Sequence, residues 1–322
     1  MAGAKENVVI SSGDCSLTLL PALGGKISSL RVGEIELLQA PLNPYNLRNH
    51  TIGFSESDAS GWDECLPSVA ECTVNTGANT ISIPDHGDLW RVQWDVLDIS
   101  SDSATLQASC FSLPLEVTRT LLLSTTKKGW LLRAMYTVAN RGNTNAPWSW
   151  AAHPLFAAEV GDRIVLPDSI QQLRVEGSAH DRAGKSGDVI AWPHATLPDG
   201  TKVNLSVAQD ISSGIGDKLF AGPLGRSESS ENWCTLERPG VGLRLTVQFD
   251  PTLTPYLGLW ICFGGWPEKE GKKQMCVAIE PATAPVDSLA QNGPWSKILA
   301  PGQTFSWPME LRIDRAEREA FL

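Results

Sequence analysis

Histidine is scarce in this 322-residue sequence, and it is the side chain best suited to proton transfer near neutral pH. His153 stands in the apolar, tryptophan-rich stretch 148–156 and directly precedes Pro154. Because a residue before proline is pushed toward extended geometry, we expect His153 to lie on a strand, where an acid or base is held in place. A histidine that only fills the core fits the same pattern.

Glu280 repeats this pattern, because it ends the apolar run 277–279 and directly precedes Pro281. Burial raises the pKa of a carboxyl group toward the working range of a general base. A glutamate that ends a strand and faces water is the alternative interpretation. Glu280 and His153 are therefore the candidates for a base and an acid.

Two further side chains are candidates for ligand contact. His86 precedes Gly87 in a turn, and the missing side chain of Gly87 allows a ligand or a backbone segment to approach closely. In the segment 257–263, strand alternation places Trp260 opposite an apolar face and beside Gly258. An indole in that position can stack on the C–H face of a pyranose. A turn histidine bonded to its own loop and a second buried face are the corresponding structural alternatives.

Motifs for several other chemistries do not occur in the sequence. It contains no phosphate-binding loop, no dinucleotide fingerprint, no Gly-x-Ser-x-Gly elbow and no HExxH zinc motif. Imidazoles and carboxylates remain, which restricts the chemistry to proton transfer, hydrolysis or elimination. We therefore expect no cofactor and no metal.

The composition narrows the class of partner. Acidic residues outnumber basic ones 36 to 26, giving a formal net charge of -10, which argues against a nucleic-acid partner. No apolar run is long enough to cross a membrane, and residues 1–7 lack the apolar core of a secretory signal. Seven cysteines without a CxxC motif fit buried thiols in a reducing compartment, so we expect a cytoplasmic protein.

The elements that must position these side chains are expected to be short strands. Segments such as 132–138 and 243–249 alternate apolar and polar residues with the period of a strand. Helical periodicity is weak, and its best case is Asp314–Phe321. Many strands, few helices and no strand–helix–strand rhythm predict an all-β fold, a large antiparallel β-sandwich with few short helices, as one domain over residues 1–322.

Several segments, taken in order, resemble the aldose 1-epimerase (mutarotase) family of the galactose mutarotase-like superfamily. The matching stretches run nearly from end to end and are Leu23-Gly24-Gly25-Lys26-Ile27-Ser28-Ser29-Leu30, Gly61-Trp62-Asp63-Glu64-Cys65-Leu66-Pro67, Asp85-His86-Gly87, His153-Pro154-Leu155-Phe156, Leu257-Gly258-Leu259-Trp260, Gly264-Gly265-Trp266-Pro267 and Ile279-Glu280-Pro281. The resemblance implies a large antiparallel β-sandwich, in agreement with the strand pattern.

The resemblance also implies roles for individual residues. Glu280 corresponds to the family's base and His153 to its acid, and His86 helps to hold the sugar near its ring oxygen. Many mutarotases carry a substrate-binding arginine before the His-Gly turn, and this sequence has no clear counterpart, since Arg48 matches that position poorly. In some hexose-6-phosphate epimerases an arginine closely follows the His-Gly pair, and here Arg91 comes one position later than in that pattern, with Trp90 in its place. The family's sugar-binding aspartate has two candidates, which are Asp63 and Asp217.

The resulting hypothesis is an isomerase that interconverts the α and β anomers of a hexose without a cofactor. Glu280 is expected to be ionised and His153 protonated, which predicts a bell-shaped rate profile. Hydrogen bonds from Asp63, Glu64 and His86, with stacking on Trp260, are expected to orient the sugar.

Three alternatives stay open at this point. They are a hexose-6-phosphate 1-epimerase, a non-catalytic carbohydrate-binding protein on the same scaffold, and a glycoside hydrolase or lyase. The sequence gives no oligomeric state and does not identify the sugar.

Overall fold

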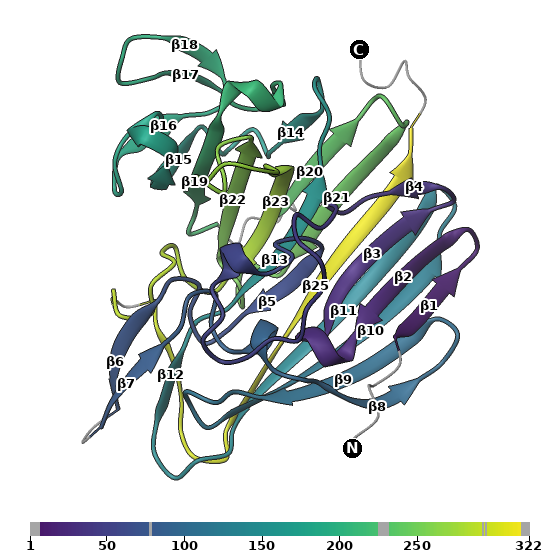
Figure 1. Ribbon diagram of the computed structural model, residues 1–322, viewed down its shortest axis with the longest axis vertical. Coiled ribbons are helices and arrows are strands. Elements are labelled where there is room, and N and C mark those ends of the chain that lie inside the picture. The colour runs from purple at the N-terminus through teal and green to yellow at the C-terminus, as the bar shows by residue number, and fades with distance from the viewer. Residues whose placement is uncertain (1–6, 77–78, 225–231, 292, 294, 317–322) are drawn as a thin grey trace.

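Two large antiparallel sheets dominate the computed structural model, which describes residues 7–76, 79–224, 232–291, 293 and 295–316 (Figure 1). The larger sheet has eleven strands. Along the sheet these are β1 (Val8–Ser12), β2 (Cys15–Leu20), β3 (Lys26–Val32), β5 (Trp62–Cys65), β13 (Ala151–Ala157), β23 (Met275–Ala282), β22 (Tyr256–Phe263), β19 (Ile215–Ala221), β15 (Gln172–Ser178) and β16 (Val189–Ala191), with β4 (Ile35–Glu36) paired to β3. The predicted all-β sandwich is confirmed.

The second sheet has eight strands. Its order is β14 (Arg163–Val165), β20 (Trp233–Arg238), β21 (Leu243–Phe249), β25 (Thr304–Arg315), β11 (Gly129–Asn140), β10 (Leu115–Thr125), β9 (Ser103–Ser109) and β8 (Asp95–Ile99). The predicted alternation of 243–249 is confirmed, because every second side chain of β21 is buried. The expected helix at Asp314–Phe321 is wrong for its first three residues, because Asp314 and Arg315 end strand β25 and Ala316 lies in no helix; residues 317–321 lie outside the described residues.

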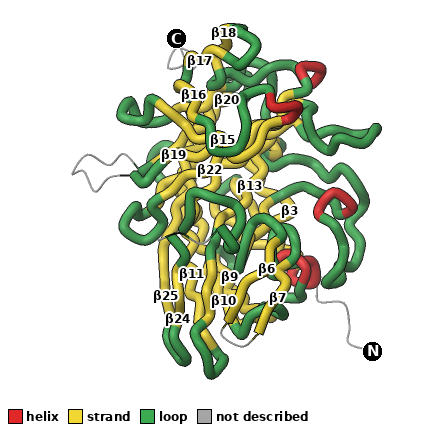
Figure 2. Tube along the Cα trace, turned by 90° about the vertical axis from the view of Figure 1, so that its left-hand side faces the viewer, coloured by secondary structure: helices red, strands yellow, loops and turns green. Residues whose placement is uncertain are grey.

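Small hairpins and single-turn helices complete the described part of the chain. The hairpins are β6 (Cys72–Thr76) with β7 (Asn79–Ile83), β12 (Ala146–Trp148) with β24 (Lys297–Leu299), and β17 (His194–Thr196) with β18 (Lys202–Asn204). The 3₁₀ turns are η1 (Pro21–Leu23), η2 (Phe54–Glu56), η3 (Leu89–Arg91), η4 (Ala179–Asp181) and η5 (Ile211–Ser213). Figure 2 shows the short helices in the loops to one side of the strands. Within these residues, no helix has the length and apolar character needed to cross a membrane.

Buried side chains from both sheets form one large apolar cluster, and a polar link crosses it. Arg119 on β10 lies 3.1 Å from Oε1 of Glu64 on β5, and both side chains are fully buried. Tyr136 and Trp150 each donate a hydrogen bond of 2.9 Å to the same carboxylate. Burial raises the pKa of Glu64, while Arg119 and these two donors favour its ionised form.

Loss of one partner from this buried ion pair is expected to be costly. Arg119→Met should lower the free energy of unfolding by about 3–5 kcal/mol, because it leaves the Glu64 carboxylate buried without a counter-charge. Arg133→Met is the matched control, since Arg133 pairs with Glu310 on the exposed side of the neighbouring strand and should cost less than about 1 kcal/mol. Urea unfolding measures both, and equal losses would contradict this account of the core.

Candidate functional site

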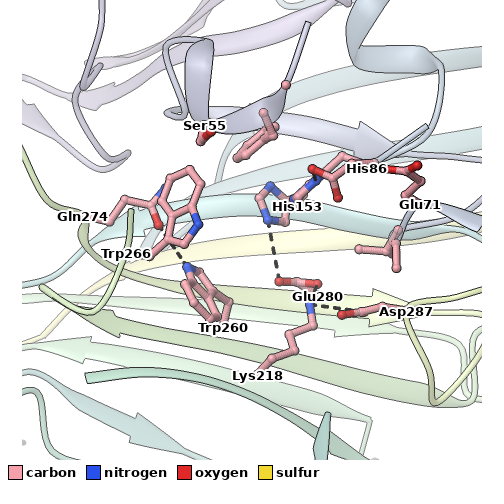
Figure 3. Close-up of a pocket in the computed structure, with 15 residues that line it drawn as sticks. Ser55, Glu71, His86, His153, Lys218, Trp260, Trp266, Gln274, Glu280 and Asp287 are labelled. Atoms are coloured by element: carbon pink, nitrogen blue, oxygen red, sulfur yellow. Dashed lines mark hydrogen bonds and ion pairs between the residues drawn. The ribbon is translucent and has the colours of Figure 1, made fainter. Parts of the chain in front are cut away.

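A cavity of about 540 Å³ opens on the face of the larger sheet that points away from the second sheet, over strands β13, β19, β22 and β23 (Figure 3). Loops that are distant in sequence complete its wall. The lining residues are Gly53, Phe54, Ser55, Val69, Ala70, Glu71, Asp85, His86, His153, Lys218, Trp260, Trp266, Gln274, Glu280 and Asp287. Four of the six residues predicted for the site are therefore brought together here, and Asp63 and Glu64 are not.

Strand register brings Glu280 and His153 together. In the β13–β23 pair, Ala151 lies opposite Ala282 and Leu155 opposite Ala278, so His153 and Glu280 occupy facing positions. The Nε2 atom of His153 lies 3.9 Å from Oε1 of Glu280, and Oε1 accepts no hydrogen bond from the protein. The predicted extended geometry before each proline is confirmed, since both residues lie inside strands. A base and a proton-bearing ring thus face each other across a narrow gap.

His153 is neutral at neutral pH. Burial lowers its pKa well below the usual 6.5, and the nearby His86, Lys218 and Lys26 lower it further. The expectation of a protonated His153 is therefore corrected, because burial and then three positively charged or chargeable neighbours oppose a charge on this ring.

Lys218 and Asp287 lie next to Glu280, and no sequence pattern predicted that these three residues meet. The ammonium group of Lys218 donates a hydrogen bond to Oε2 of Glu280 and lies 3.7 Å from Oδ1 of Asp287. Burial lowers the pKa of Lys218, but the two carboxylates outweigh burial and raise it, so Lys218 is charged. Burial raises the pKa of Asp287 to about 6, and Glu280 adds to that shift while Lys218 opposes it.

His86 faces the cavity from a tight turn. Its backbone has the left-handed φ of 59°, and Gly87 after it has a φ of 68°. The backbone of Leu66 packs against Gly87. The sequence predicted that either a ligand or a backbone segment approaches Gly87 closely, and the structure shows the backbone segment. The imidazole of His86 stacks on Phe54 with ring centroids 4.0 Å apart, and Oδ2 of Asp85 lies 2.9 Å from its Nδ1.

Trp260 lines the cavity, as its strand position predicted. Its indole N–H donates a hydrogen bond of 3.0 Å to Gln274, whose amide N–H in turn donates to the carbonyl of Ala59 at 3.0 Å. These two hydrogen bonds hold the N–H edge of the indole in place.

Asp63 and Glu64 are corrected as sugar-binding candidates. Asp63 is buried against Lys26 at 2.5 Å and Arg48 at 3.3 Å, so its oxygens already have internal partners. Glu64 points to the opposite face of β5 and belongs to the link with Arg119 between the sheets. The pattern Trp-Asp-Glu-Cys predicted a strand, but it did not show which groups cover each face of that strand.

The other candidates that the resemblance raised are also engaged internally. Asp217 accepts hydrogen bonds from Ser178 and Arg182. Arg48 bridges Asp58 and Asp63, and the guanidinium of Arg91 donates to backbone carbonyls of the loop that carries His86. Neither arginine lines the cavity.

These two sheets form the galactose mutarotase-like fold. Three solved structures show the likeness over nearly the whole chain. The Slr1438 protein of Synechocystis sp. PCC 6803 has a TM-score of 0.69 and 17% identity, covering 96% of each chain. A galactose mutarotase-like protein of Lactobacillus casei has a TM-score of 0.61 and 19% identity, covering 96% of this chain and 100% of that one.

The third is the GalM/aldose epimerase homologue of C. elegans, with a TM-score of 0.64, 12% identity and coverage of 97% and 99%. No family model and no curated protein matches the sequence. The likeness therefore lies in the fold, while sequence identity to these structures is low.

The titration of His153 tests the electrostatics of the cavity. Its imidazole NMR signals should stay constant from about pH 8 down to 6.5 and move only at lower pH, because burial and neighbouring charges lower its pKa. In His86→Asn the titration should shift to higher pH, because one of these charges is lost. The NMR signals of His153 are assigned by their absence from the spectrum of His153→Gln. A midpoint at or above 6.5 in the unmodified protein would contradict this description.

Proposed function

We propose that this protein is an aldose 1-epimerase, which interconverts the α and β anomers of an uncharged aldohexose. The observation that carries the proposal is the facing pair of His153 and Glu280, 3.9 Å apart at the floor of the cavity. The two oxygens of a hemiacetal are bonded to the same carbon, so an acid and a base that close can each contact one of them.

The chemistry that such a pair performs is ring opening followed by reclosure. Oε1 of Glu280 takes the proton from the O1 hydroxyl while Nε2 of His153 gives a proton to the ring oxygen, so that the C1–O5 bond breaks and a C1 aldehyde forms. Rotation about C1–C2 presents the other face of the aldehyde, and the reverse transfers close the ring. Each transfer typically contributes about 10²- to 10⁴-fold in rate.

The low pKa of His153 suits proton donation if the imidazole carries the transferred proton only briefly. An imidazolium held near Lys218 and Lys26 is a strong acid, which favours proton donation to a weakly basic ring oxygen. The reaction then begins from the minor state in which His153 carries the proton and Glu280 does not.

The charge of the cavity favours an uncharged sugar over its phosphate. Four carboxylates line it, from Glu71, Asp85, Glu280 and Asp287, while Lys218 is its lysine and is already paired. A phosphate group is usually bound by a fork of arginine or lysine donors. The two arginines considered from the sequence, Arg48 and Arg91, bind protein groups instead.

Aromatic faces supply the remaining part of a sugar site. Trp260, Trp266, Phe54 and His86 all line the cavity. Ring C–H groups pack well on such faces, and hydroxyls at the edge can reach His86 and Gln274. A cytoplasmic location belongs to the same proposal, since all seven cysteines are free thiols.

The first test removes the base. Glu280→Gln should reduce mutarotation by at least about 100-fold while the protein stays folded and still binds sugar, because the amide keeps the shape but does not accept the proton. Polarimetry or NMR exchange between anomers measures the rate. Glu116→Gln, a change on the second sheet, is the matched control and should keep full activity. Near-full activity in Glu280→Gln would overturn the assignment of the base.

A substrate panel tests the charge argument. Mutarotation of free glucose and galactose should be accelerated with a higher kcat/KM than that of their 6-phosphates, because the carboxylates repel a phosphate dianion. Higher efficiency on a 6-phosphate would instead favour a hexose-6-phosphate epimerase. Saturable binding of sugars without any acceleration would favour a carbohydrate-binding protein.

A further inference from the structure

We propose that Lys218 is a positioning residue that selects which oxygen of Glu280 receives the proton, and that Asp287 counterbalances it. This inference rests on the proposed epimerase function and extends it to two residues that the sequence did not single out. The ammonium group of Lys218 donates a hydrogen bond to Oε2 of Glu280, which leaves Oε1 as the free acceptor facing His153.

The geometry of the larger sheet makes this contact possible. Lys218 is on β19 and Glu280 on β23, and β22 runs between them. The Lys218 side chain must therefore reach over β22, where Gly258 stands directly opposite Glu280. A Cβ atom at Gly258 would lie 3.3 Å from Cβ of Glu280 and 3.1 Å from the ring of Phe220, so a larger residue would crowd this crossing.

Asp287 is fixed as the second partner of Lys218. Its backbone N–H donates to Glu176 at 2.9 Å, and its carbonyl accepts from the N–H groups of Val69 and Ala70 at 2.9 and 2.8 Å. Its Oδ1 lies 3.7 Å from the ammonium group and has no hydrogen bond from the protein. Figure 3 shows Glu280 with His153 on one side and Lys218 and Asp287 on the other.

One ammonium group therefore serves two carboxylates. When both are ionised, the charge of Lys218 is divided between them, and Glu280 keeps more of its basicity. When Asp287 is protonated or neutralised, the same charge acts on Glu280 alone and weakens it as a base. The other titratable groups around the pair are His153 on β13, Cys65 on β5, Cys276 on β23, His86 in its turn and Glu176 on β15.

The charge sharing can be measured without any assay of activity. Carboxyl ¹³C NMR of the whole protein follows the titration of Asp287, with its signal assigned from Asp287→Asn. The midpoint, near pH 6 in the unmodified protein, should rise in Lys218→Met, which removes the cation, and fall in Glu280→Gln, which removes the competing anion. Lys202→Met on the exposed strand β18 is the control and should leave the midpoint unchanged. An unchanged midpoint in both site variants would overturn the proposal.

The kinetic test separates positioning from a merely structural role. Lys218→Met should lower kcat at least about tenfold with a smaller change in KM, and Lys218→Arg should recover part of that loss because it restores the charge. Asp287→Asn should lower kcat and move the acidic limb of the pH profile to lower pH, opposite to the shift in Lys218→Met. If kcat is unchanged in Lys218→Met, or if both variants shift the limb in the same direction, positioning by Lys218 is wrong.

The two experiments also separate this inference from the proposed function. If the unmodified protein accelerates no mutarotation, the epimerase function fails, whereas the NMR titration still decides whether Lys218 is shared. If Lys218→Met does not fold, Asp287→Asn and Glu280→Gln decide the question with Lys218 in place.

Discussion

The buried ion pair between Glu280 and Lys218 is the interaction on which the rest of the site depends. Glu280 is fully buried, and an isolated carboxylate in such a place is costly. A directly bonded ammonium group offsets that cost. Burial lowers the pKa of the facing His153 imidazole, and the same charge, together with His86 and Lys26, lowers it further. One cation thus acts on both members of the candidate catalytic pair.

The fold satisfies this constraint through strand register rather than through a single motif. Four neighbouring strands, β13, β23, β22 and β19, deliver His153, Glu280, Trp260 and Lys218 to one face of the larger sheet. The opposite face packs on the second sheet, and the Arg119–Glu64 link crosses that core. A shift of one residue in the register of any of these four strands would turn the side chain that it carries toward the core. The arrangement of the site therefore depends on the strand register.

Sequence patterns predicted much of this arrangement, because alternation and proline act locally. The period of two in 243–249 gave the fold class, and the prolines after His153 and Glu280 gave two strand positions. Lys218 could not be predicted in the same way, because its partner lies 62 residues away and two strands across. Its only local signal is a lysine within an otherwise largely apolar strand.

Asp63 and Glu64 were predicted to bind the sugar, but neither lines the cavity. Their neighbourhood matches the family pattern, yet Lys26, Arg48 and Arg119 bind them from other elements. A pattern along one strand does not reveal such partners, because they come from residues 15 to 55 positions away and depend on the completed packing. The organisation of residues 1–322 as one domain stays a prediction.

The proposed roles of His153 and Glu280 can be tested with a crystal structure of Glu280→Gln bound to an aldohexose. We expect a pyranose in the cavity, with O1 within hydrogen-bond distance of residue 280 and the ring oxygen within that distance of Nε2 of His153. A sugar bound with its anomeric carbon directed away from both residues, or bound outside this cavity, would contradict these roles.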